Sequence, residues 1–197
     1  MQVASMGKLT AVCVTIILGG VTASQWPAIE QASKYNHPET VSALLKAGVN
    51  KDMQNGHGWT AMHVASKFGS TDVITTLIEH GANVTIPTNS GRTPIFAATW
   101  WGHINIVQLL INANASISHV DNKGETALHI AAKWNRVDIA RLLLQKGAES
   151  KKQNIWGMTP ADVARNEGYD QLANSIDSFT LTTAYTTSTF TASTPKP

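Results

Sequence analysis

The sequence predicts an all-α fold, an array of about five stacked helix-turn-helix units, and three observations support this prediction. Glycine, threonine, alanine and leucine each recur every 33 residues, in four separate columns of the sequence. Within a unit, apolar residues follow the i, i+3 and i+4 spacing of two short amphipathic helices. Turn-forming residues separate the units. The columns are Gly58, Gly91, Gly124 and Gly157; Thr60, Thr93, Thr126 and Thr159; Ala32, Ala65, Ala98, Ala131 and Ala164; and Leu44, Leu77, Leu110 and Leu143.

The first element in chain order, residues 1–23, is predicted to be a signal peptide. An apolar run, LTAVCVTIILGGV, follows Lys8 and contains Cys13, the single cysteine. Its length of about a dozen residues suits the core of a secretory signal better than a membrane span of roughly 20 residues. Small residues up to Ala23 favour cleavage after that position. We therefore expect a secreted protein, or a periplasmic one in a bacterium; an uncleaved membrane anchor is the alternative.

The repeat period divides residues 24–178 into five units, of which the first and the last are degenerate. Gly81 and Gly147 follow the second helix of their units, where a left-handed residue is favoured, and Asn114 fills the equivalent place. Asp121-Asn122-Lys123-Gly124 is a run of turn formers, which predicts a hairpin-like finger between units. The predicted units are 24–54, 55–87, 88–120, 121–153 and 154–178.

The last element, residues 179–197, is predicted to be a disordered tail. Serine and threonine dominate this segment and it contains no acidic residue. Two glycosylation sequons begin at Asn83 and Asn114, and they support a eukaryotic secretory route only weakly, because such sequons also arise by accident.

Three segments carry a recognisable signature: TAMHVA from Thr60, TPIFAA from Thr93 and TALHIA from Thr126. They resemble the Thr-Pro-Leu-His-x-Ala motif of the ankyrin-repeat family. This resemblance covers about residues 25 to 177 and implies stacked helix-turn-helix units with fingers along one edge. The final unit reads TPADVA, with Asp162 in the histidine position, and its second helix is polar, as expected of a terminal unit that faces water.

Composition and motifs argue against an enzyme and against a dedicated nucleic-acid binder. The chain has 15 basic and 13 acidic residues, a net charge of only +2. It contains no nucleophile elbow, phosphate-binding loop or dinucleotide fingerprint. The resemblance implies that His63 and His129 stabilise a turn, and the other histidines show no metal-ligand spacing. We therefore predict no catalytic residue, metal or cofactor.

Two neighbouring columns near the end of the first helix are the candidate binding residues. One holds Tyr35, Phe68, Trp101 and Trp134; the other holds Lys34, Lys67, Trp100 and Lys133. The resemblance implies that both face the concave groove, although the aromatic residues could instead pack on one another between units. Trp100 is the strongest candidate, because its column is otherwise mostly lysine. The fingers add His57, Trp59, Arg92, Lys123 and Trp156.

These residues predict a non-enzymatic module that binds a protein partner of unknown identity through its groove and fingers. Aromatic anchors among polar residues are typical of protein interfaces. Carbohydrate binding or a structural scaffold role is the alternative, since flat aromatic faces also stack on sugar rings. Single-stranded nucleic acid is disfavoured by the near-zero net charge and the secretory signal. No membrane contact is expected after signal cleavage.

Overall fold

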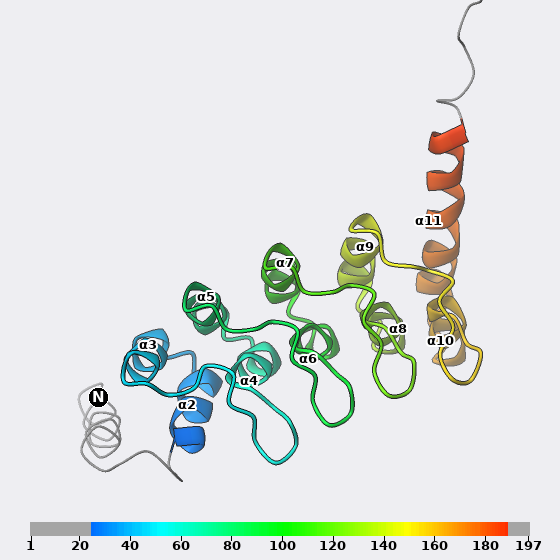
Figure 1. Cartoon of the computed structure of the whole chain (residues 1–197). Helices are drawn as coiled ribbons and strands as arrows, with labels where there is room; N and C mark the ends of the chain where they lie inside the picture. The colour runs from blue at the N-terminus through cyan, green and yellow to red at the C-terminus, as the bar shows by residue number, and fades with distance from the viewer. Residues whose placement is uncertain (1–24, 189–197) are drawn as a thin grey trace, which may run out of the picture. The chain divides into compact units, whose positions relative to one another are not determined.

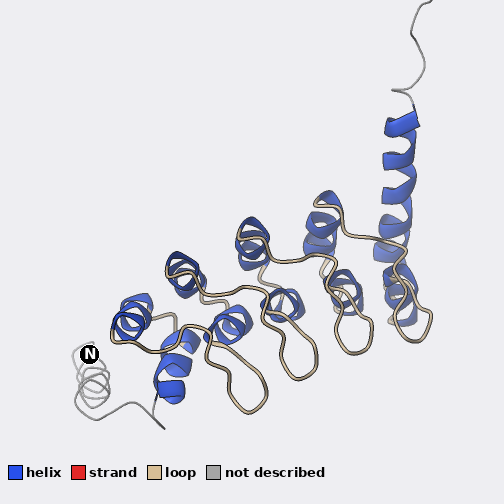
Figure 2. Ribbon diagram, viewed as in Figure 1, coloured by secondary structure: helices blue, strands red, loops and turns tan. Residues whose placement is uncertain are grey.

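The computed structural model describes residues 25–188, with side chains up to residue 179. The predicted signal peptide and the chain beyond residue 188 lie outside this part. The described residues form ten helices joined by turns and loops, with no strand among them (Figure 2). They divide into two compact units, unit 1 up to Ser116 and unit 2 from Ile117 onward.

Unit 1 is built from three helix pairs arranged in two layers (Figure 1). One layer contains α2, α4 and α6, and each helix packs against the next; α3, α5 and α7 pack in the same way in the second layer. The loops before α4 and before α6, which are the predicted fingers, project to the same side of unit 1 (Figure 1). The bounds are α2 Gln25–Lys34, α3 Pro38–Lys46, α4 Ala61–Phe68, α5 Thr71–Glu79, α6 Pro94–Trp101 and α7 Ile104–Asn112.

Unit 2 contains two helix pairs, in which α8 packs against α10 and α9 packs against α11. Asp177 on α11 accepts a hydrogen bond from Lys151 Nζ at 2.6 Å and also pairs with Arg165, so α11 is tied to the loop before α10 and to α10 itself. The bounds are α8 Ala127–Lys133, α9 Val137–Gln145, α10 Pro160–Asn166 and α11 Asp170–Ser188.

Helix α11 corrects the predicted end of the repeat domain. The repeat pattern predicts an end of the domain at residue 178 and the composition predicts disorder from residue 179, but α11 continues to Ser188. No glycine or proline occurs between Asp170 and Ser188, so this range contains no strong helix breaker. Phe179 also lines a small cavity of about 100 Å³ with Leu144 and Ile176. The disorder predicted from serine and threonine content therefore does not hold for residues 179–188.

The repeated alanine and leucine columns form the core of each unit. All five alanines of the column are completely buried, and Leu77, Leu110 and Leu143 are also 0% exposed. Alanine suits these positions because its small side chain lets neighbouring helices approach closely. The helix ends also follow the prediction: Gly81, Gly147 and Asn114 all have positive φ, at 70°, 91° and 65°.

The signature histidines close a hydrogen-bonded cap at the start of the first helix. Thr60 Oγ1 accepts a bond from the His63 backbone N–H, and the Thr60 backbone N–H donates to His63 Nδ1 at 3.1 Å. Since Nδ1 is an acceptor, the ring proton lies on Nε2, which donates to the carbonyl oxygen of Arg92 at 3.0 Å. Burial lowers the pKa of His63 to about 4. The predicted role of this histidine in stabilising the turn is confirmed.

The same cap recurs in the other repeats with informative changes. In unit 2, Thr126 and His129 repeat it, and His129 Nε2 donates to the Met158 carbonyl at 3.1 Å. Asp162 keeps both cap bonds to Thr159 with a carboxylate. Thr93 has no side-chain cap bond, and the backbone N–H of Phe96 donates to the Thr93 carbonyl at 2.9 Å instead. The buried Phe96 side chain has no acceptor for the Thr93 N–H, so the reciprocal bond is also missing.

Candidate functional site

Three large aromatic side chains are exposed along unit 1, one at the end of each first-layer helix. Tyr35 is 58% exposed, Phe68 44% and Trp101 50%. They are 33 residues apart, so the repeat itself places them at equivalent positions. Tyr35 comes directly after α2, and Phe68 and Trp101 are the last residues of α4 and α6. Because exposed large apolar side chains in series are uncommon on a monomer, this face is the first candidate for a binding surface.

Two lysines lie between these rings. Lys34 Nζ is 5.1 Å from the ring centroid of Tyr35 and 5.3 Å from that of Phe68. Lys67 Nζ is 5.1 Å from Phe68 and 5.5 Å from Trp101. Each lysine therefore connects its own repeat to the next repeat of unit 1 by cation–π contacts. We call Lys34, Tyr35, Lys67, Phe68 and Trp101 the aromatic-lysine row.

This arrangement decides between two interpretations of the aromatic column in unit 1. The alternative interpretation was that these rings pack on one another as part of the scaffold. No ring–ring contact joins Tyr35, Phe68 and Trp101 within the described residues; the lysine ammonium groups separate them. The rings remain substantially exposed, so direct packing of one ring on the next is wrong here.

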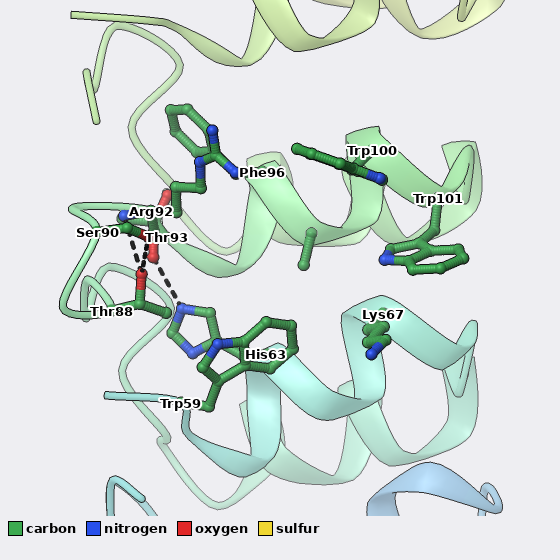
Figure 3. A pocket seen from close by; sticks show the side chains of 11 residues that line it. Trp59, His63, Lys67, Thr88, Ser90, Arg92, Thr93, Phe96, Trp100 and Trp101 are labelled. Atoms are coloured by element: carbon green, nitrogen blue, oxygen red, sulfur yellow. Dashed lines mark hydrogen bonds between the residues drawn. The ribbon is translucent and has the colours of Figure 1, made fainter. Parts of the chain in front are cut away.

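A pocket of about 270 Å³ lies between α4 and α6 and continues the row toward the fingers (Figure 3). We call it the α4–α6 pocket. Lys67 and Trp101 lie at one end, and Trp59 and His63 lie at the other, beside the finger residues Thr88 and Ser90 (Figure 3). The structure thus brings together five predicted site residues, Trp59, Lys67, Arg92, Trp100 and Trp101, from two fingers and two helices.

The two tryptophans on α6 differ in exposure in the opposite sense to the prediction. Trp100, the strongest sequence candidate for outward contact, is only partly exposed, and the Arg92 guanidinium carbon lies 5.2 Å from its ring centroid. Trp101 is the more exposed of the two. Both line the α4–α6 pocket, but successive helical positions point about 100° apart, and this rotation turns Trp101 toward solvent.

Unit 2 has a pocket at the equivalent place of the repeat, with a different chemistry. This α8–α10 pocket has a volume of about 390 Å³. Each of its residues lies 66 positions after its counterpart in the α4–α6 pocket, so Glu125 stands for Trp59, Asn166 for Trp100 and Glu167 for Trp101. The lysine is the same in both pockets, with Lys133 at the position of Lys67. The acidic residues make this second pocket much less suited to an anion.

The remaining predicted site residues lie outside the α4–α6 pocket. His57 is exposed on a finger, and its carbonyl accepts a bond from the Asn89 N–H at 3.1 Å. Trp134 is 40% exposed. Trp156, 55% exposed, lines the α8–α10 pocket and lies under Lys123, whose Nζ is 5.7 Å from its centroid. Asn83 and Asn114 are both exposed, as a glycosylated residue must be.

Sequence reasoning missed Phe96 and Thr88, which also line the α4–α6 pocket. The sequence could have indicated Phe96, because this residue replaces the signature histidine in its repeat. That departure removes a polar cap and adds an apolar wall. Thr88 had no comparable signal, since its side chain meets the pocket only through the folding of the finger, where its hydroxyl bonds Ser90 Oγ at 2.9 Å.

Other kinds of site find no support in the described part of the chain. Between residues 25 and 188, no three histidine, cysteine, aspartate or glutamate side chains gather as ligands for a metal ion. Within the same range, no helix has both the length and the apolar character that crossing a bilayer requires.

The paired helices, the threonine caps and the joined finger loops define a helix-turn-helix repeat protein with an exposed aromatic face. Comparison with family models gives the particular family: a model described as ankyrin repeats, in three copies, matches residues 1–88, 29–121, 88–154 and 107–175. The chain belongs to the ankyrin-repeat family. This family generally mediates protein–protein interactions and is typically non-enzymatic. No curated protein matches the chain.

Proposed function

We propose that this protein is a secreted or exported, non-enzymatic module that binds a protein partner through the aromatic-lysine row and the neighbouring fingers. The observation that carries the proposal is the row itself: three aromatic side chains, each more than two-fifths exposed, alternate with lysines along unit 1. The membership of the family supports the class of activity.

The physical argument rests on what such a surface gains when it is covered. Tyrosine and tryptophan bring a large apolar area with few rotatable bonds, so ordering them on binding costs little entropy. Residues of this kind act as hot spots, each contributing about 2 kcal/mol or more to binding in favourable cases. The lysines around them add electrostatic selectivity and a faster association rate rather than bulk affinity.

Carbohydrate binding is the second candidate, since the same rings could stack on sugars. In unit 1, however, Lys34 and Lys67 already lie over ring faces, and a stacked sugar would have to displace these ammonium groups. The scaffold alternative predicts that the rings matter for stability rather than for binding. Both alternatives therefore differ from the proposal in what a surface substitution changes.

The test is a pull-down from the native fluid that compares wild type with Trp101→Glu. Glutamate already occupies the equivalent position at Glu167, so the repeat tolerates it there. The matched control is Ile104→Thr on α7, which changes another exposed apolar residue, 38% exposed, to the residue found at Thr71. We expect the captured protein to be lost with Trp101→Glu only. Capture unchanged by Trp101→Glu, or a fall in thermal stability as the sole effect, contradicts the proposal.

The proposed export has a separate test. N-terminal sequencing of the mature protein should begin at Ser24, immediately after the predicted cleavage at Ala23. A mature chain that still begins with Met1 contradicts cleavage and leaves the uncleaved anchor as the remaining interpretation.

A further inference from the structure

The charge of Lys67 has aromatic partners and no acidic one. Its ammonium lies 5.1 Å from Phe68, 5.5 Å from Trp101 and 5.7 Å from Trp59, measured to the ring centroids. Within residues 25–188 it forms no salt bridge. An ammonium held between rings is partly desolvated but not neutralised, so it remains available to an incoming anion.

The walls of the α4–α6 pocket extend this preference. Its charged residues are Lys67 and Arg92, and no aspartate or glutamate lines it. The apolar lining comes from Phe96, Trp100 and Trp59. A volume of about 270 Å³ is smaller than most small-molecule sites, which begin near 300 Å³, and is suited to one large side chain. The complement of this pocket is thus an apolar side chain with a carboxylate beside it.

The repeat supplies an internal comparison. The α8–α10 pocket retains the lysine at position 133 but places Glu125 and Glu167 in its lining. These carboxylates lie where Trp59 and Trp101 stand in unit 1. An acidic ligand would meet like charges there, so the two equivalent pockets should differ in selectivity.

We propose that the α4–α6 pocket receives an acidic segment of the protein partner, with a carboxylate at Lys67 and an adjacent aromatic or large aliphatic side chain between Trp59 and Trp100. This inference rests on the proposed function and gives the chemistry of its partner.

The sequence offers variants that the repeat already accommodates at equivalent positions. Trp100→Lys places there the residue found at Lys34, Lys67 and Lys133. Trp59→Glu copies Glu125. Lys67→Glu reverses the central charge, and Lys67→Gln removes the charge while retaining most of the stem, which guards against a misfolded reversal variant. Lys133→Glu is the matched control, since it makes the same change in the α8–α10 pocket.

The experiment is a selection of random twelve-residue peptides displayed on phage, performed on the immobilised full chain. Peptides that are enriched are then synthesised, and their affinity is measured by fluorescence anisotropy against each variant. We expect enriched peptides to be net negative, with an acidic residue next to Trp, Phe, Tyr, Leu or Met. We expect Lys67→Glu to weaken their binding about tenfold or more, and Trp59→Glu, which replaces an apolar wall by a like charge, by a similar factor.

Several results would overturn the inference. They are enrichment of basic or wholly polar peptides, a selection with no enrichment, and a Lys133→Glu variant that loses as much affinity as Lys67→Glu. Lys67→Gln with wild-type affinity would also contradict it, provided that its melting temperature is unchanged. The pocket would be a carbohydrate site instead if no peptide is selected and the chain is retained on a polysaccharide column. That retention would have to be lost with Lys67→Glu.

The outcome is distinguishable from failure of the proposed function. The chain could capture a protein from the native fluid through Trp101 while a selected acidic peptide does not compete with that protein for the chain. In that case the protein-binding function stands and the inferred acidic segment of the partner is wrong. If neither capture nor selection succeeds, both are wrong.

Discussion

Acid should destabilise the repeat array through one identifiable histidine. Inside the cap, His63 accepts a hydrogen bond on Nδ1 and donates one from Nε2, so its ring is held in the neutral form. Burial is the main reason that its pKa falls from 6.5 to about 4, while the bond to the Arg92 carbonyl acts in the opposite direction. Protonation would require both a buried charge and the loss of the bond that Nδ1 accepts from the Thr60 backbone N–H.

The direction and the size of the pH effect on the free energy of unfolding follow from this lowered pKa. A histidine with a lowered pKa in the folded state binds a proton more readily when the chain is unfolded, so acid favours unfolding. The contribution of His63 to stability is complete above about pH 6.5 and is lost progressively as the pH falls toward about 4. A shift of this size corresponds to about 3 kcal/mol when fully expressed. The pKa of His129 is also lowered, by burial, so the two histidines act in the same direction.

The assay is urea unfolding, followed by far-ultraviolet circular dichroism at about pH 7 and about pH 4.5, for wild type and His63→Phe. Phenylalanine stands at the equivalent position, Phe96, and cannot titrate. Carboxylates titrate in both proteins, so the difference between their pH dependences isolates His63. Wild type should lose about 2 kcal/mol more than the variant over this range. An identical pH dependence in the two proteins, or an NMR titration of His63 centred near pH 6.5, would refute the reasoning.

Three further predictions concern stability and can be measured by urea titration. Leu110→Ala removes a completely buried side chain and should cost roughly 2 to 5 kcal/mol; a loss below about half a kcal/mol would contradict its place in the core. Thr126→Ala removes a helix cap and should cost about 1 kcal/mol, whereas Thr93→Ala, which removes no cap bond, should cost clearly less; equal losses would show that the cap bond is not the cause. Ser66→Ala should be neutral or stabilising by up to about 1 kcal/mol, because the Ser66 hydroxyl is buried without a hydrogen-bond partner and the equivalent residue is Ala132; a loss of more than about 1 kcal/mol would reveal a bond that the structure does not contain.

Much of the fold was predictable because it depends on short-range physics repeated along the chain. Gly81, Asn114 and Gly147 end helices by local backbone conformation, and the buried alanines follow from a fixed period. The end of α11 was not predictable in the same way. Its Ser/Thr-rich composition indicated disorder, but composition does not record that the segment continues an anchored helix without a glycine or proline.

The candidate site shows the same division. The sequence by itself placed Tyr35, Phe68 and Trp101 in one column and the lysines beside it, because a constant period carries equivalent residues to equivalent places. Only the tertiary structure decided that Lys67 lies between rings, that Trp101 is more exposed than Trp100, and that Trp59 meets Trp100 in one pocket. Trp59 and Trp100 are 41 residues apart, on a finger and on the first helix of the next repeat. Their meeting depends on how neighbouring helices pack and how each side chain is rotated about its helix, and a repeat period contains neither quantity.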